Sequence, residues 1–227
     1  KTNSKKALLS SAFALVLSVA MLIGTTFAWF TDTASTGINK IQAGNLDVKL
    51  MYSTDMVTWK EATDQTKLFN DNALWEPGYT QVVYLKVVNA GNLALKYETG
   101  FSKNYTSNRG KNVNGDWYRV DNYLKIGTAE TETKFANREA VWAAVAATEK
   151  TLSKDVMLTD GWVTLEAGKA SKPFAVAIYM PTSVGNEANA SRLRPSSVSG
   201  LGIEVRATQA TVESDSFGSN YDANTAT

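Results

Sequence analysis

The sequence contains no cysteine and no histidine among its 227 residues. Without cysteine there are no disulfide bonds, so stability must come from a buried core, a bound ion or a neighbouring subunit. Without histidine the chain lacks the commonest general base and the imidazole ligands of zinc sites. These absences exclude Ser-His-Asp and Cys-His hydrolases and His-Glu-x-x-His metalloproteases.

The chain also lacks an excess of charge of either sign. Its formal net charge is +1 at pH 7, and basic and acidic residues are interspersed along most of its length. Because nucleic-acid binding requires a basic stripe, we expect no nucleic-acid partner. No pair of acidic residues stands out as the carboxylate pair of a glycosidase, and we do not predict an enzyme.

The first 28 residues have the composition of a secretory signal peptide. Three lysines lie within the first six residues, residues 7–24 form an apolar body, and small residues follow. We predict a signal-peptide helix over residues 1–28 and cleavage by signal peptidase between Ala28 and Trp29. An uncleaved membrane anchor is the alternative, because about 18 apolar residues are at the lower limit for crossing a bilayer. Both interpretations place the rest of the chain outside the cell.

Beyond residue 41 the sequence is typical of short β-strands separated by turns. Alternation of apolar and polar residues predicts strands at 45–50, 81–89, 93–97, 117–120, 123–126, 162–165, 174–180 and 203–210. Helical spacing of Phe135, Trp142 and Val145 predicts one helix within residues 133–150. The combination predicts an all-β fold, a jelly-roll-like β-sandwich with one inserted helix.

The chain shows no internal repeat and no clear linker between residues 45 and 212. We therefore predict one β-sandwich domain over 42–213, preceded by an arm at 29–41 and followed by a flexible polar tail at 214–227. Asn114, Asp116 and Asp121 offer oxygen ligands for calcium, but their spacing does not match an EF-hand loop. A surface turn is the simpler interpretation, and we predict no cofactor.

Short motifs occur along the chain in a recognisable order. They are the export-site sequence at 24–32, Ala-Gly-Asn-Leu-Asp-Val at 43–48, Glu-Pro-Gly at 76–78, Val-Asn-Ala-Gly-Asn-Leu-Ala-Leu at 88–95 and Ala-Thr-Gln-Ala at 207–210. In these motifs and their order the sequence resembles the TasA/camelysin family of exported, fibre-forming matrix or surface proteins.

The resemblance implies a jelly-roll subunit of an extracellular fibre or biofilm-type matrix, exported by a dedicated signal peptidase. In TasA-like members the mature N-terminal segment of one subunit is added as a strand to the next. Carried onto this chain, the donor arm is 29–41, with Trp29, Phe30, Ile38 and Ile41 as its large apolar residues. The implied partners are copies of the same chain and an accessory matrix or anchor protein. Some camelysin-like relatives are described as metalloproteases, an activity that this histidine-free chain leaves without its usual ligands.

Elementary energetics agrees with such an arm. Two adjacent aromatic residues, Trp29 and Phe30, are costly to leave in water, and an extended arm on a sheet edge gains main-chain hydrogen bonds. Head-to-tail addition does not close and therefore gives filaments. In one alternative the aromatic tip packs on its own domain. In another the protein is a monomeric cell-surface binding module, with loops 102–115 and 182–200 holding a ligand at one end of the sandwich.

The signal-peptide prediction has a direct test. N-terminal sequencing of exported protein should return Trp29, because the small residues Thr26 and Ala28 fit the shallow pockets of a signal peptidase. Exported material that still begins at Lys1 would contradict cleavage and favour the membrane anchor.

Overall fold

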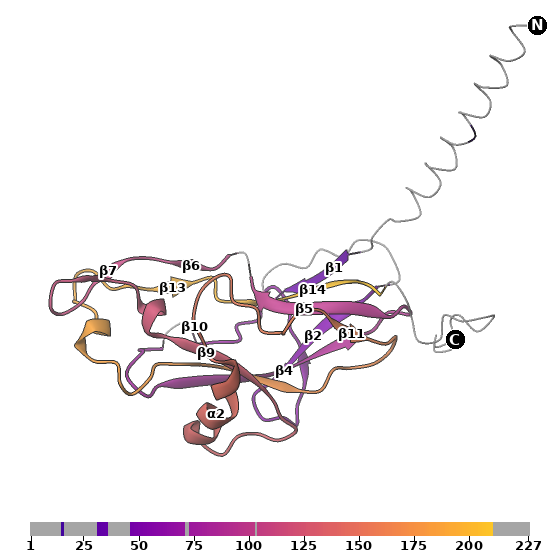
Figure 1. Ribbon diagram of the computed structural model, residues 1–227, viewed down its shortest axis with the longest axis horizontal. Helices are drawn as coiled ribbons and strands as arrows, with labels where there is room; N and C mark the ends of the chain where they lie inside the picture. Colours follow the sequence, from indigo (N-terminus) through magenta and orange to yellow (C-terminus); the bar gives the residue numbers. More distant parts are fainter. Residues whose placement is uncertain (1–14, 16–30, 36–45, 71–72, 103, 211–227) are drawn as a thin grey trace, which may run out of the picture. The chain divides into compact units, whose positions relative to one another are not determined.

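The computed structural model describes residue 15 and residues 31–35, 46–70, 73–102 and 104–210 (Figure 1). The predicted cleavage pair Ala28 and Trp29 and the arm residues Phe30, Ile38 and Ile41 lie outside these residues, as does the predicted tail. No helix within the described ranges is long and apolar enough to cross a membrane. The chain divides into two units, Lys1–Phe30 and Thr31–Thr227, and the description below concerns the second.

Most strands belong to two antiparallel sheets (Figure 1). The four-stranded sheet has the order β1 (Thr31–Ser35), β14 (Ile203–Gln209), β5 (Leu95–Phe101) and β11 (Val163–Leu165). The six-stranded sheet has the order β10 (Lys150–Thr151), β9 (Lys125–Glu130), β12 (Phe174–Tyr179), β4 (Thr80–Asn89), β2 (Val48–Ser53) and β3 (Lys60–Glu61). Two short pairs join β13 (Val198–Ser199) to β6 (Thr106–Ser107) and β7 (Gly110–Lys111) to β8 (Trp117–Tyr118). Over residues 46–210, as far as the structure describes them, the predicted all-β class with one inserted helix is confirmed.

The two large sheets share one hydrophobic core. Alternate residues of β4, among them Val83, Leu85 and Val87, are buried together with Ile203 and Val205 of β14. β4 lies inside its sheet between β12 and β2. Each fully buried aliphatic side chain of this kind contributes about 1.5–3 kcal/mol. The core therefore supplies the stability that disulfides do not.

The helix α2 (Arg138–Val145) covers the outer face of the six-stranded sheet (Figure 1). Its buried residues Val141 and Val145 pack against Ala177 and Tyr179 of β12. Gly127 of β9 lets the helix approach closely, because a Cβ there would lie 2.7 Å from Val145. The cover on this second face explains why β12 is buried along most of its length.

The helix occupies only part of the range 133–150 within which it was predicted. Thr131 lies before the helix, and its hydroxyl donates to the Thr133 carbonyl at 2.7 Å in a separate turn. The helix begins after Asn137, whose side chain accepts from the Ala140 amide at 2.9 Å. It ends in a 3₁₀ turn, η2 (Ala146–Thr148).

Other strand predictions hold to within a few residues, with one exception. The predicted pair at 117–120 and 123–126 is interrupted by the 3₁₀ helix η1 (Val120–Tyr123), which leaves only β8 and β9 as strands. The turn closes through a hydrogen bond from the Leu124 amide to the Asp121 carbonyl. A further 3₁₀ turn, η3 (Asn186–Ala188), lies in the long loop after β12.

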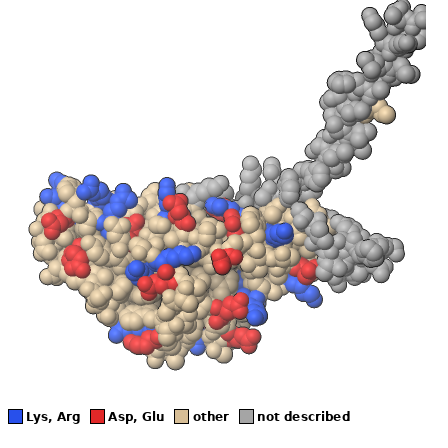
Figure 2. All heavy atoms as spheres, in the orientation of Figure 1, with Lys and Arg blue, Asp and Glu red and all other residues tan. Residues whose placement is uncertain are grey.

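Basic and acidic side chains are mixed over most of the face in Figure 2, in line with the near-neutral composition.

A single buried amide, Asn89, links the two large sheets. Its side-chain nitrogen lies 2.8 Å from the carbonyl of Leu93, 3.2 Å from that of Leu165 and 3.1 Å from that of Glu166. Its side-chain oxygen accepts from the Gly91 amide at 3.0 Å. Asn89 ends β4 of one sheet and Leu165 belongs to β11 of the other, so this residue holds a turn and joins the two layers.

Replacing this amide should be costly. In Asn89→Ala the buried carbonyls lose their donor, and we expect the free energy of unfolding to fall by about 2–4 kcal/mol. Denaturant unfolding followed by tryptophan fluorescence measures it. Asn92→Ala is the matched control, because Asn92 is exposed in the same turn and should change stability by no more than about 0.5 kcal/mol. Equal effects of the two substitutions would show that Asn89 does not tie the sheets.

Candidate functional site

The strand β1 is the described part of the predicted arm, and it forms the outer strand of the four-stranded sheet. It pairs antiparallel with β14, with Thr31 opposite Thr208 and Ser35 opposite Glu204. It also approaches β2 of the six-stranded sheet and so closes one side of the sandwich. The strand on which it lies belongs to the same chain. The sequence did not indicate which sheet edge this segment would join. In the structure it joins β14, and pairing with a neighbouring copy stays a prediction.

β14 would be an edge strand without β1. On its other side it pairs along its whole length with β5, from Ile203 opposite Phe101 to Gln209 opposite Leu95. Val205 and Ala207 are fully buried. The outer main-chain groups of β14 would face water if β1 left, and an unpaired edge of this kind attracts another strand. The surface that can bind another strand is therefore the outer row of main-chain N–H and C=O groups of β14, a strand whose side chains are anchored in the core.

Charges along this edge compensate one another locally. Arg206 Nη1 lies 3.4 Å from Glu98 Oε1 on β5, and Arg206 Nε lies 3.7 Å from Glu204 Oε1 on β14 itself. Glu204 is buried, whereas Arg206 is partly exposed. Pairs of this kind contribute little to stability, about 0–1 kcal/mol each. They do leave the edge without a strong net charge that would repel an incoming copy of the chain.

The opposite edge of the same sheet is a weaker candidate. It is formed by β11, which has three residues and pairs with β5 from Val163 opposite Tyr97 to Leu165 opposite Leu95. Trp162 and Val163 are partly exposed there. Since a short edge strand offers few main-chain hydrogen bonds, β11 is a poorer acceptor than the five-residue partner zone on β14.

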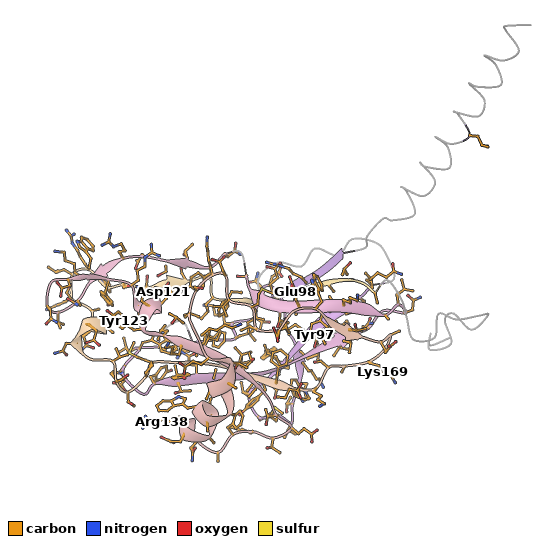
Figure 3. All side chains as sticks on the ribbon, in the orientation of Figure 1. Tyr97, Glu98, Asp121, Tyr123, Arg138 and Lys169 are labelled. Atoms are coloured by element: carbon orange, nitrogen blue, oxygen red, sulfur yellow. The ribbon has the colours of Figure 1, made fainter. Side chains whose placement is uncertain are left out.

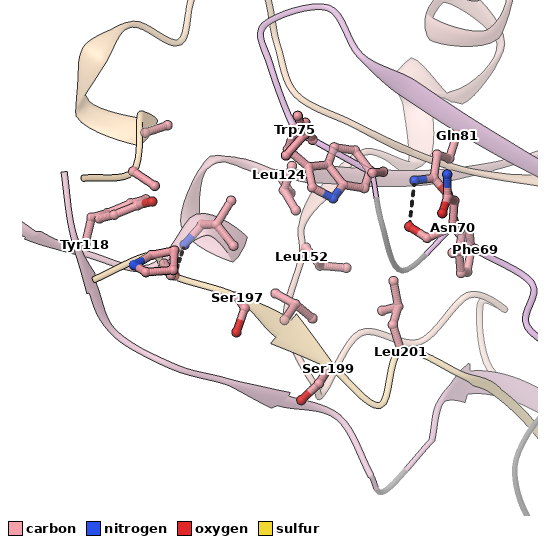
Figure 4. Close-up of a pocket in the computed structure, with 18 of the residues that line it drawn as sticks. Phe69, Asn70, Trp75, Gln81, Tyr118, Leu124, Leu152, Ser197, Ser199 and Leu201 are labelled. Carbon is pink, nitrogen blue, oxygen red and sulfur yellow. Dashed lines mark hydrogen bonds between the residues drawn. The ribbon is translucent and has the colours of Figure 1, made fainter. Parts of the chain in front are cut away.

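A cavity of about 370 Å³ lies at one end of the sandwich (Figure 4). Aromatic and aliphatic side chains dominate its walls, with serine hydroxyls and an amide at its rim. They include Phe69, Trp75, Tyr118, Leu124, Leu152 and Leu201. The rim amide belongs to Gln81, whose side-chain oxygen accepts from the Asn70 amide at 2.8 Å. A lining of this kind suits a small, mainly apolar ligand.

Both loops that the sequence proposed for ligand binding meet at this end. Val198 pairs with Ser107 and Ser199 with Thr106, and the Lys111 amide donates to the Arg194 carbonyl at 2.8 Å. Only the 182–200 loop contributes to the wall of the cavity, through residues 188–190 and 195–200. The wall residues Phe69, Trp75 and Leu152 come from distant segments, so no local pattern could have indicated them.

The residues considered for calcium binding do not converge. Asp116 is exposed in a turn, where its amide donates to the Asn112 side-chain oxygen at 2.8 Å. Asp121 is buried, and its Oδ2 accepts from the Tyr105 hydroxyl at 2.9 Å (Figure 3). Burial, and then the Asp121 carboxylate, raise the pKa of Tyr105 above its usual value. In the described ranges no three acidic side chains gather closely enough to hold a metal ion.

No protein-family model, curated protein or solved structure matches this chain. The resemblance to TasA/camelysin proteins therefore stays an expectation based on short motifs.

Proposed function

We propose that this chain is a secreted structural subunit of an extracellular fibre or biofilm-type matrix, with the jelly-roll topology that the TasA/camelysin resemblance implies. It polymerises when the N-terminal arm of one copy takes the place of β1 on β14 of the next copy. The observation that carries the proposal is the pairing of Thr31–Ser35 with β14, which places part of the arm on a sheet edge.

The attachment of β1 makes exchange between copies physically easy. Its sequence, Thr-Asp-Thr-Ala-Ser, contains no large apolar residue, so main-chain hydrogen bonds must supply most of its binding. The same segment from another copy would form the same bonds in the same register. Residues 36–45 connect β1 to the core in sequence and can span at most about 33–36 Å when extended. Exchange of an identical element between copies is a low-cost route to assembly, and it gives an open filament when each copy donates its arm to the next copy rather than back to its own donor.

Burial of the large apolar residues of the arm on a neighbouring copy would lower the free energy of the polymer relative to the monomer. Trp29 and Phe30 directly precede β1, and Ile38 and Ile41 follow it. Burying two aromatic side chains on a receiving copy is worth about 3–6 kcal/mol. Assembly would therefore depend on protein concentration, as mass action requires.

A second candidate function is a monomeric cell-surface binding module. The observation that favours it is the apolar cavity of about 370 Å³ at one end of the sandwich, beside loops 102–115 and 182–200. Under this alternative β1 stays on its own β14 and the protein remains a monomer at all concentrations.

Electron microscopy of two truncated chains separates the two candidates. The chain that begins at Trp29 should form fibres, whereas the chain that begins at Lys40 should stay a folded monomer, because it lacks the donor strand. Circular dichroism and gel filtration check folding and size.

A chain that begins at Trp29 and lacks residues 217–227 is the matched control, since it loses the same length of chain from the polar tail. It should form fibres like the longer chain. Fibres from the chain that begins at Lys40 would refute strand donation, and monomers from every variant would favour the binding module.

A further inference from the structure

One exposed tryptophan at the end of the domain is surrounded by positive charge. Trp117 is 51% exposed. Lys111 Nζ lies 5.2 Å from the centre of its ring, Arg109 Cζ 5.3 Å and Arg194 Cζ 5.8 Å. We call Arg109, Lys111, Trp117 and Arg194 the cationic tryptophan cluster.

The fold places these four side chains together by strand pairing and loop contact. Lys111 lies directly opposite Trp117 in the β7–β8 pair, and Arg109 is two residues before Lys111 and so belongs to the same face of the hairpin. Arg194 comes from the long loop after β12. That loop is held by hydrogen bonds in both directions, from the Lys111 amide to the Arg194 carbonyl and from the Ser191 amide to the Lys111 carbonyl, each 2.8 Å.

The positive charge of the cluster is not neutralised. In the part of the chain that the structure describes, none of its three cations forms an ion pair with a carboxylate. Two further exposed arginines are close in sequence: Arg119 lies two residues after Trp117, and Arg192 lies two residues before Arg194. Figure 2 shows Lys and Arg side chains gathered along the top of the end that carries β7. Cation–π attraction of about 0.5–1 kcal/mol per exposed contact offsets only part of the repulsion between like charges.

Within the described ranges, no acidic group at this end forms an ion pair with the cationic tryptophan cluster. Asp116 is exposed beside Trp117 in sequence. Glu187 is engaged by the Gly185 amide at 2.8 Å, which lowers its pKa. Asp121 is buried against Tyr105. A patch of unpaired cations of this kind attracts an anionic partner.

Aliphatic side chains at the tips of the same two loops indicate which anionic partner fits. Val113, in the turn between β7 and β8, is 55% exposed, and Leu193 is 89% exposed between Arg192 and Arg194. A soluble polyanion would gain little from either. A bilayer would gain from both, because apolar tips enter the boundary of the acyl chains and tryptophan favours the headgroup level.

We propose that this end of the domain docks on an anionic lipid bilayer. Val113, Leu193 and Trp117 enter the interface, and Arg109, Lys111 and Arg194 contact lipid phosphates. Each cation near such a surface strengthens binding about fivefold, and the apolar tips add burial that salt does not screen. The docking surface lies away from β1 in Figure 1, so bilayer docking does not depend on strand donation.

A single fluorescent label tests insertion. The chain has no cysteine, so Leu193→Cys accepts one environment-sensitive nitrobenzoxadiazole label on an otherwise unlabelled full-length chain. Phosphatidylcholine vesicles that contain phosphatidylglycerol should shift its emission to the blue, and pure phosphatidylcholine vesicles should not. Val57→Cys is the control, because Val57 is 82% exposed and lies between β2 and β3. Its label should stay solvent-like even if residues 1–28 enter the bilayer, because each label reports only its own position.

Charge variants test the cations on the same labelled chain. The triple variant Arg109→Gln/Lys111→Gln/Arg194→Gln should need about a hundredfold more anionic lipid for the same spectral shift. Lys60→Gln/Lys154→Gln/Lys169→Gln removes the same charge from exposed positions elsewhere and should change the shift little. A Leu193→Cys label that stays solvent-like, equal losses in the two triple variants, or an equal shift with dextran sulfate in solution would overturn the proposal.

Discussion

Main-chain pairing between β1 and β14 is the constraint on which the rest depends. β14 is fully paired with β5 on one side and carries Ile203, Val205 and Ala207 into the shared core. Its other side needs a strand, because a row of unsatisfied peptide groups at the edge of a long strand invites pairing. Thr31–Ser35 pairs with this side of β14. Main-chain hydrogen bonds would be the same whether this segment came from the same copy of the chain or from another.

Under the proposal, the domain exchanges this strand and keeps the core that its other strands form. In the described ranges the largest fully buried side chains come from β2, β4, β5, β9, β12, β14 and α2 and from the segments between them. Asn89 ties the two layers at one end of β4, and α2 covers the outer face of the six-stranded sheet. An arm that contributes hydrogen bonds to a pre-formed domain can leave and rebind, whereas a core strand would unfold the domain if it left.

The sequence predicted those features that are set by local periodicity. Alternation located β4, because Val83, Leu85 and Val87 must face one side of any strand. The helix is shorter than the range 133–150 in which it was expected, because it begins only after Asn137, whose side chain caps it. Features formed by segments far apart in the sequence could not be predicted from it. They are the pairing of β1 with β14, the wall of the cavity, and the contact of Arg194 with Trp117. Such pairings depend on the closure of long loops, which leaves no periodic signal in the chain.

Covalent trapping of the arm tests strand donation most directly. Thr31 and Thr208 are register partners, and the chain has no cysteine of its own, so Thr31→Cys/Thr208→Cys offers one disulfide between β1 and β14. Oxidation after assembly should give a ladder of covalent multimers on a denaturing gel without reductant, and oxidation in dilute solution should give cross-linked monomers. Thr208→Cys alone should give no ladder beyond a dimer. Cross-linked monomers only, recovered from assembled fibres, would contradict donation of the arm between copies.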